Sequence, residues 1–187
     1  MKTILILASG NGTNARNIIN HFAEYEEVGI IGVISSSENA GVVEVARSLN
    51  TKCLVVDKED LNSGRFISFL RKANPTLIVL AGFLLMVPKE ITEMFRVVNI
   101  HPSLLPRHGG KGMHGMNVHR AVIEAGDEES GITIHWADAE YDRGEIIEQH
   151  RCKVIPGDTP ETLCQRVRQL ESAYPEAIER ILTLDID

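Results

Sequence analysis

Short runs of apolar residues alternate along the first half of the chain with segments whose apolar residues recur at helical spacing. Thr3 to Ala8 is the first run, and a continuous apolar run is typical of a strand that is buried on both faces. Residues 14–25 follow, with their apolar side chains on one helical stripe. The alternation predicts an α/β fold built on a doubly wound, mostly parallel, Rossmann-like sheet.

The same alternation continues to residue 100. Apolar runs predict further strands over 28–34, 52–56, 77–81 and 96–100, and helical stripes predict helices over 42–49 and 66–73. Pro88 marks a short helix between the last two of these strands, because proline is favoured in the first turn of a helix.

The second half of the chain follows a different pattern. Residues 103–116 are rich in Gly, Pro and His and show no periodicity, which predicts a long loop of the kind that often carries function. After a helix at 118–125, apolar and polar residues alternate over 132–137, as in a strand with one buried face. Residues 145–154 can pair with that strand, so we expect a C-terminal antiparallel extension of the sheet.

Two more helices are predicted near the end of the chain. Asp158 to Glu161 combines a cap residue, a proline and an early acid, which together mark a helix start, and a last helix is expected over 175–184. The sequence contains no repeat, low-complexity run or linker. Its 187 residues are therefore expected to form a single domain, residues 1–187.

Composition excludes several classes of protein. The net charge of −7 argues against long nucleic acids as partners, although a local pocket can still hold a small anion. The three cysteines, Cys53, Cys152 and Cys164, show no metal-ligand or redox spacing, which is typical of reduced thiols in the cytoplasm. The longest uncharged apolar stretch, 76–88, is too short to span a membrane. We expect a soluble, cytoplasmic protein with no membrane partner.

The first candidate site is the glycine-rich segment 9–14, between the first predicted strand and the first helix. A glycine turn in this position lets backbone N–H groups and the helix N-terminus approach a phosphate. A dinucleotide is disfavoured, because the second strand ends in Ser35 to Ser37 instead of an acid that would hold a ribose. The alternative is a tight turn that Thr13 or Asn14 caps.

The second candidate is Asn99 with His101, at the end of a predicted strand. Successive residues of a strand point to opposite faces, so these two side chains project together while Val98 and Ile100 point the other way. An amide that donates to an oxyanion and an imidazole that titrates near neutral pH suit attack on a carbonyl. The alternative is a pair that only stabilises a turn.

The third candidate is the acidic turn 138–144. One of its acids can orient His101 or favour its charged form, although three acids in a loop are usually just solvated. His135 shares a predicted strand face with Thr133, and a hydrogen-bonded buried histidine is the alternative for it.

Two features of the long loop remain open. The segment Gly109 to Gly112 carries one cation, Lys111, and is either a lid, a phosphate contact or a surface excursion. Five histidines from His101 to His135 lack compact ligand spacing and no cysteine joins them, so no metal is expected.

Four of these segments together resemble the folate-dependent formyltransferases, and the resemblance covers nearly the whole chain. They are Gly10 to Asn14, Ala81 to Phe83, Asn99 to Pro106 and Tyr141 to Gly144, in this order. The Asn-x-His-Pro-Ser-Leu-Leu-Pro run is specific to the superfamily, and the glycine turn resembles that of the members that formylate phosphoribosylglycinamide.

The resemblance implies formyl transfer from 10-formyltetrahydrofolate to the amine of 5-phosphoribosylglycinamide, in de novo purine biosynthesis. It implies that Asn99, His101 and Asp142 are catalytic and that no metal takes part. It further implies a phosphate site at Gly12, Thr13 and Asn14. The residues implied to bind folate are Leu84, Leu85, Met86, Val87, Asn99, Asp138, Ala139, Glu140, Tyr141 and Asp142. The protein would act as a monomer or homodimer. The alternatives are another folate-dependent N-formyltransferase, a formyltetrahydrofolate hydrolase, or a non-catalytic nucleotide-binding module.

This chain departs from the family in three places. The loop 107–118 is longer than usual because of the Gly-Gly-Lys-Gly insert. Ser63 stands where relatives place a folate-contacting Arg, with Arg65 nearby. Glu171 matches an acid that grips the substrate, but the segment after it is one residue short, and one residue rotates a helix position by about 100°.

Overall fold

The seven strands form one sheet in the order β3-β2-β1-β4-β5-β6-β7. The computed structural model describes residues 1–184, so the last three residues of the predicted domain lie outside the described part. The strands are β1 (Lys2–Ala8), β2 (Val28–Ser35), β3 (Cys53–Val55), β4 (Leu77–Leu80), β5 (Val97–His101), β6 (Glu129–Trp136) and β7 (Ile146–Lys153). Strands β1 to β5 pair in parallel, and β6 and β7 pair antiparallel. The predicted α/β class, with its antiparallel C-terminal extension, is confirmed.

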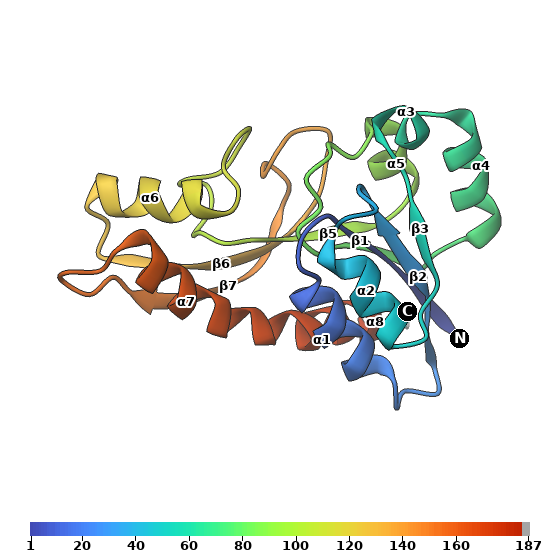
Figure 1. Ribbon diagram of the computed structural model, residues 1–187, viewed down its shortest axis with the longest axis horizontal. Helices are drawn as coiled ribbons and strands as arrows, with labels where there is room; N and C mark the ends of the chain where they lie inside the picture. Colours follow the sequence, from blue (N-terminus) through green and yellow to red (C-terminus); the bar gives the residue numbers. More distant parts are fainter. Residues whose placement is uncertain (185–187) are drawn as a thin grey trace.

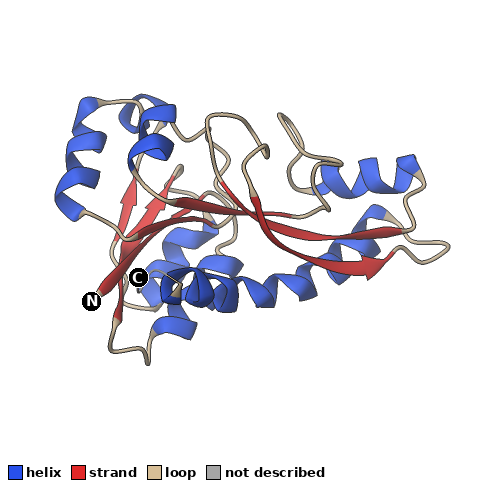
Figure 2. Ribbon diagram, turned by 180° about the vertical axis from the view of Figure 1, so that it is seen from behind, coloured by secondary structure: helices blue, strands red, loops and turns tan. Residues whose placement is uncertain are grey.

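The helices lie on both sides of this sheet (Figures 1 and 2). They are α1 (Thr13–Phe22), α2 (Gly41–Ser48), α3 (Lys58–Leu61), α4 (Gly64–Ala73), α5 (Lys89–Met94), α6 (Met116–Ala125), α7 (Pro160–Leu170), the 3₁₀ turn η1 (Glu171–Ala173) and α8 (Tyr174–Thr183). Every predicted helix is present, with small shifts at the ends. None of the helices in residues 1–184 is long and apolar enough to cross a bilayer.

Strand β1 shows why a continuous apolar run was the right signal. Ile4 and Ile6 pack into a core cluster with residues of α1, α7 and α8. Leu5 and Leu7 point the other way, into a second cluster with residues of α4 and α5. The strand is therefore covered on both faces, as the doubly wound arrangement requires.

The prediction for β6 was wrong in one respect. An alternating pattern predicts one exposed face, but Thr133 and His135 are as buried as Ile132 and Ile134. The loop after β5 covers the polar face: the Thr133 hydroxyl donates to the Ser103 carbonyl and accepts from the Leu105 N–H, at 2.7 and 2.9 Å. The alternation reflected specific hydrogen bonding inside the protein and not solvent.

The short helix α3 was not predicted, because its residues Lys58-Glu59-Asp60-Leu61 carry no apolar stripe. It is set by a capping box instead, in which Asp57 and Asp60 each accept the backbone N–H of the other.

Tyr174 ties the C-terminal helices to the centre of the sheet. Its ring is fully buried, and its hydroxyl is hydrogen-bonded to the carbonyls of Leu80 on β4 and Val98 on β5, at 3.0 and 3.1 Å. These are the two strands whose carboxyl ends carry the cleft described next.

Candidate active site

A cleft of about 560 Å³ opens at the carboxyl ends of β4 and β5. Its walls come from the N-terminus of α1, from the loops after β4, β5 and β6, and from the last turn of α7. From β1 the chain continues to β2 and β3 on one side, and from β4 it continues to β5 on the other side, so the strand order reverses between β1 and β4. Residues that follow each of these two strands, Asn14 and Gly82, line the cleft. The cleft therefore lies at a topological switch point, the usual ligand position in an open α/β sheet.

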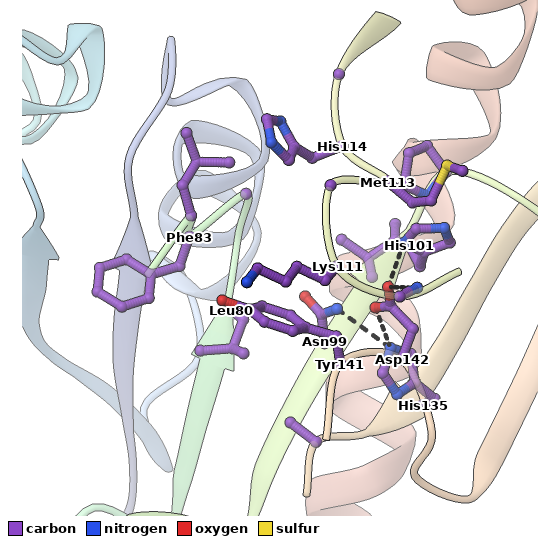
Figure 3. A pocket seen from close by; sticks show the side chains of 18 of the residues that line it. Leu80, Phe83, Asn99, His101, Lys111, Met113, His114, His135, Tyr141 and Asp142 are labelled. Atoms are coloured by element: carbon purple, nitrogen blue, oxygen red, sulfur yellow. Dashed lines mark hydrogen bonds and ion pairs between the residues drawn. The ribbon is translucent and has the colours of Figure 1, made fainter. Parts of the chain in front are cut away.

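Asn99 and His101 reach this cleft from β5, as their spacing predicted (Figure 3). Val98 and Ile100 belong to the core cluster below. His101 is 4% exposed and stands beside Asp142, which comes from the loop after β6. His101 Nδ1 lies 3.4 Å from Asp142 Oδ2, so the structure brings the three predicted catalytic side chains to one place.

The second ring nitrogen of His101 is also engaged. Nε2 lies 2.8 Å from the carbonyl oxygen of His108. A carbonyl only accepts, so Nε2 carries a proton, and a doubly protonated ring gives its other N–H to the Asp142 carboxylate. The geometry thus suits a positively charged imidazole.

Asp142 is an ionised carboxylate held by several donors. Burial alone would raise the pKa of Asp142, but the His101 and His135 rings and the Gly110 N–H hold it well below its usual range. The Gly110 N–H donates to Oδ2 at 2.9 Å, and His135 Nε2 lies 3.6 Å from Oδ1. Asp142 adopts φ +56°, in the left-handed region.

His135 lies opposite Asn99 in the β5–β6 ladder. Its Nδ1 is 2.8 Å from the Trp136 carbonyl and therefore carries a proton. While the ring is neutral, Nε2 accepts from the Asn99 amide, whose Nδ2 is 3.1 Å away, and it can donate to the Asp142 carboxylate only when the ring is protonated. This contact orients the amide of Asn99. His135 is thus a hydrogen-bonded, buried histidine, as the alternative from the sequence had it, and it also lines the cleft.

The glycine turn enters the cleft through Asn14. Gly12 is the N-cap of α1 at φ +80°, and no side chain caps the helix, so the alternative of a turn capped by Thr13 or Asn14 is not what the structure shows. Both residues lie inside the helix, after the N-cap position, and Asn14 Nδ2 donates to Glu171 Oε2 at 2.8 Å. The Asn14 Oδ1 atom is buried without a partner in the described part of the chain. The first turn of α1 is thus left open to a ligand.

Glu171 lines the cleft although its segment is one residue short. The 3₁₀ turn η1 accounts for this, because it completes a turn in three residues where an α-helix needs 3.6. Burial raises the pKa of Glu171, and the Asn14 amide and the Arg168 charge only partly oppose this shift.

Most of the other predicted residues line the cleft. They are Leu84, Leu85, Met86, Val87, Asp138, Glu140, Tyr141 and Lys111. Ala139 is not among the lining residues. Ser63 caps α4 by accepting the Phe66 N–H, and Arg65 follows it on the exposed side of that helix. The structure does not bring Ser63 or Arg65 to the cleft.

The lining residues that were missed include three with basic side chains, namely His114, His119 on α6 and Arg168 on α7. Burial and the nearby charges of Arg168 and His101 lower the pKa of His119 to about 4, and its Nδ1 has no partner among the described residues. His119 follows Val118 on an apolar helix, where a histidine is easily taken for core. Arg168 precedes Glu171 by three residues, a spacing that places both on one helix face.

Within residues 1–184, no three His, Cys, Asp or Glu side chains come together in a way that would hold a metal ion. The cleft instead offers amide, imidazole and carboxylate groups, together with the ammonium of Lys111 and the guanidinium of Arg168. These groups can bind anions and stabilise an oxyanion.

Comparison with known proteins points in the same direction. The sequence profile of a family described as "Formyl transferase" matches residues 2–178. The chain is 37% identical to a chloroplastic phosphoribosylglycinamide formyltransferase of Arabidopsis thaliana, over 96% of this chain and 65% of that protein. It is 33% identical to the phosphoribosylglycinamide formyltransferase of Haemophilus influenzae, over 96% of this chain and 86% of that one. The chain thus spans less than two thirds of the plant relative.

Solved structures agree. The phosphoribosylglycinamide formyltransferase of Anaplasma phagocytophilum superposes with a TM-score of 0.87 at 31% identity, covering 100% of this chain and 89% of that one. The enzyme of the same name from Coxiella burnetii gives a TM-score of 0.81 at 37% identity, covering 94% and 84%.

Proposed function

The chain belongs to the formyl transferase family, and from that premise we propose that it formylates the amine of 5-phosphoribosylglycinamide in purine biosynthesis. The formyl donor is 10-formyltetrahydrofolate. The observation that carries the proposal is the convergence of Asn99, His101 and Asp142 in a cleft that the Gly12 turn reaches through Asn14. The specific acceptor is proposed because relatives covered along most of their length bear that name.

The chemistry begins with attack of the amine nitrogen on the formyl carbon. A C–N bond forms, and the carbonyl oxygen gains negative charge. The Asn99 amide donates to this oxygen, and the positive charge of His101 stabilises it. When the intermediate collapses, the bond from carbon to the folate nitrogen breaks, and the proton that the amine loses goes to that nitrogen.

Asp142 supports this sequence as an anion. Its lowered pKa makes it a weak base, so its main task is to hold His101 in the charged form. It orients a water molecule that carries the proton from the amine to the departing nitrogen. No covalent intermediate with the protein is required, because the cleft positions both reactants.

The two substrates enter from different sides of the site. The phosphate binds the open first turn of α1 at Gly12, Thr13 and Asn14, where backbone N–H groups and the helix dipole favour an anion. The pterin lies between Leu84 to Val87 and the 138–142 loop. We place the reaction in the cytoplasm, where Cys53, Cys152 and Cys164 stay reduced, in line with their unpaired state.

The test is a formyl-transfer assay with phosphoribosylglycinamide and 10-formyltetrahydrofolate. Amino-sugar nucleotides serve as competing acceptors, and a reaction without acceptor measures hydrolysis. We expect formyl transfer to phosphoribosylglycinamide, reduced at least about 100-fold in His101→Ala because the charge next to the oxyanion is lost.

Each other outcome has a distinct meaning. Product only with another amine, or only formate, would replace the proposal by one of the two related activities. Undiminished transfer in His101→Ala would contradict the mechanism. Ligand binding without any transfer in the wild-type protein would favour a nucleotide-binding module.

A further inference from the structure

Three consecutive residues of the long loop, His108 to Gly110, contact both His101 and Asp142. We call these three residues the arm, and His101 with Asp142 the catalytic pair. The His108 carbonyl accepts from His101 Nε2 at 2.8 Å, and the Gly110 N–H donates to Asp142 Oδ2 at 2.9 Å. Gly109, between them, packs so closely that a Cβ would lie 3.1 Å from the Asp142 Cβ. The arm thus contacts both His101 and Asp142, which Figure 3 shows, through its backbone.

The side chain of His108, the first residue of the arm, is held by Asp127, which is not among the residues that line the cleft. His108 Nε2 lies 2.7 Å from Asp127 Oδ2, in the turn between α6 and β6, and both side chains are about 15% exposed or less. The backbone of His108 adopts φ +54°, which residues other than glycine seldom adopt. Such a conformation persists only where surrounding contacts hold it, and the Asp127 contact is of that kind.

Asp127 also receives Arg107. Arg107 Nη1 lies 3.0 Å from Asp127 Oδ1, but this side chain is 54% exposed, and exposed pairs contribute little. The His108 contact is shorter and more buried, and it belongs to the residue whose carbonyl touches His101. The two neighbours therefore provide a matched comparison.

We propose that His108, anchored by Asp127, is a positioning residue for the catalytic histidine. The anchor holds the His108 carbonyl in place as the second acceptor of the His101 ring, opposite Asp142. With both ring nitrogens engaged, the ring keeps its plane beside Asn99. The inference rests on the proposed function, since it assumes that His101 stabilises the oxyanion.

The experiment compares Asp127→Ala and His108→Asn with the control Arg107→Ala in the full chain. Asparagine tolerates the left-handed conformation but lacks the Nε2 atom, so His108→Asn removes the anchor without added backbone strain. We expect kcat for formyl transfer to fall roughly tenfold in both variants, with KM for both substrates within about twofold, because the ring is displaced and binding is not. Arg107→Ala should behave as the wild type.

A second measurement reads the ring directly. In ¹H–¹⁵N spectra of the histidine side chains, His101→Ala identifies the Nε2 proton of His101. We expect this proton to be protected from exchange in the wild type and in Arg107→Ala, and to exchange rapidly in the two anchor variants. The double variant Asp127→Ala/His108→Asn should be no slower in turnover than either single variant, since both break one link.

The proposal is overturned if the anchor variants fold and retain kcat, or if kcat falls while the His101 proton stays protected. It is also overturned if Arg107→Ala loses as much activity as they do. A wild-type protein with no formyl transfer would instead refute the proposed function, and the exchange measurement would still decide whether the anchor holds the ring.

Discussion

At the level of single residues, Asp142 is the group on which the site depends most. His101 and His135 approach its carboxylate, one at each oxygen, and a backbone N–H of the arm completes its shell. These contacts outweigh the cost of burial and lower its pKa. The contacts to the Asp142 carboxylate come from β5, β6 and the arm. Removing its charge should therefore affect both the reaction and the stability of the fold.

Asp142→Asn should lower kcat by about 100-fold or more, because the charge that supports the His101 cation is removed. The same substitution should change the acid stability of the protein. A carboxyl whose pKa is lower in the folded state stabilises the fold above its unfolded pKa of about 3.9, and this contribution is lost as the pH falls below that value. The wild type should therefore exceed the variant in stability at pH 7, and the difference should shrink below about pH 4.

Urea unfolding at a series of pH values, together with the formyl-transfer assay, checks both effects. A stability difference that stays constant from pH 7 to pH 3 would show that Asp142 is not ionised in the fold as described.

The period-two rule and the position at a strand end were enough to predict that the Asn99 and His101 side chains project to the same side of the sheet. The contacts that His108 and Gly110 make with His101 and Asp142 were beyond such reasoning, because backbone atoms make them and the sequence does not show where those atoms lie. His119 was missed because an apolar helix conceals it. For Asp142 and Glu171 the residues alone left several acids equivalent, and only the family resemblance singled them out.

At the level of elements, the turn between β1 and α1 depends on Gly12. Its φ of +80° is unfavourable for other residues, and an added Cβ would lie 2.7 Å from the Val42 Cα. Gly12→Ala should therefore destabilise the protein by about 2 kcal/mol or more, and lower Tm by roughly 4–8 °C. It should also raise KM for the phosphorylated acceptor, because the first turn of α1 is displaced.

Gly64→Ala is the matched control, since Gly64 begins α4 with open space around it and ordinary backbone angles. This variant should stay within about 1 kcal/mol of the wild type. Equal Tm values for the Gly12 and Gly64 variants would refute the argument from conformation.

Tyr174 joins one helical layer to the sheet. Burial raises the pKa of this phenol far above its ordinary value, so the hydroxyl remains a donor to the carbonyls of Leu80 and Val98. Tyr174→Phe should cost about 1–2 kcal/mol of unfolding free energy, the usual loss for a buried hydrogen bond. Tyr25→Phe removes an exposed hydroxyl that donates to Glu179, and its effect in the same urea titration should be below about 0.5 kcal/mol.

Element prediction worked where apolar periodicity alone determines the structure, as in β1 and α1. It was incomplete for α3, which a capping box sets, and for η1, where the chain tightens a turn to keep Glu171 in place. It was wrong for the outer face of β6, because a polar residue such as Thr133 is buried when the adjoining loop satisfies it. The alternating pattern of a strand shows which of its residues are polar, but the packing of the neighbouring segments determines which of them are buried.

At the level of the whole molecule, charge and function are reconciled locally. The net charge of −7 gives a field that repels anions, yet both proposed substrates are anions. The cleft offers anions two kinds of local attraction, namely the open N-terminus of α1 and two lining cations, Lys111 and Arg168. Recognition then relies on short-range contacts, which explains why composition excluded long polyanions but not these ligands.

If the chain is a single domain, as predicted, it should unfold in one cooperative step. One core cluster includes residues of the parallel strands β1, β4 and β5, of the antiparallel strand β6, and of helices from both halves of the sequence. Because these parts share a core, they should unfold together. The only tryptophan, Trp136, lies at the end of β6 and reports on the antiparallel extension, whereas far-ultraviolet circular dichroism reports on all helices. We expect both signals to give one urea midpoint and one slope. Two separated midpoints would show that the antiparallel extension is a unit of its own, and residues 1–187 would then not behave as one domain.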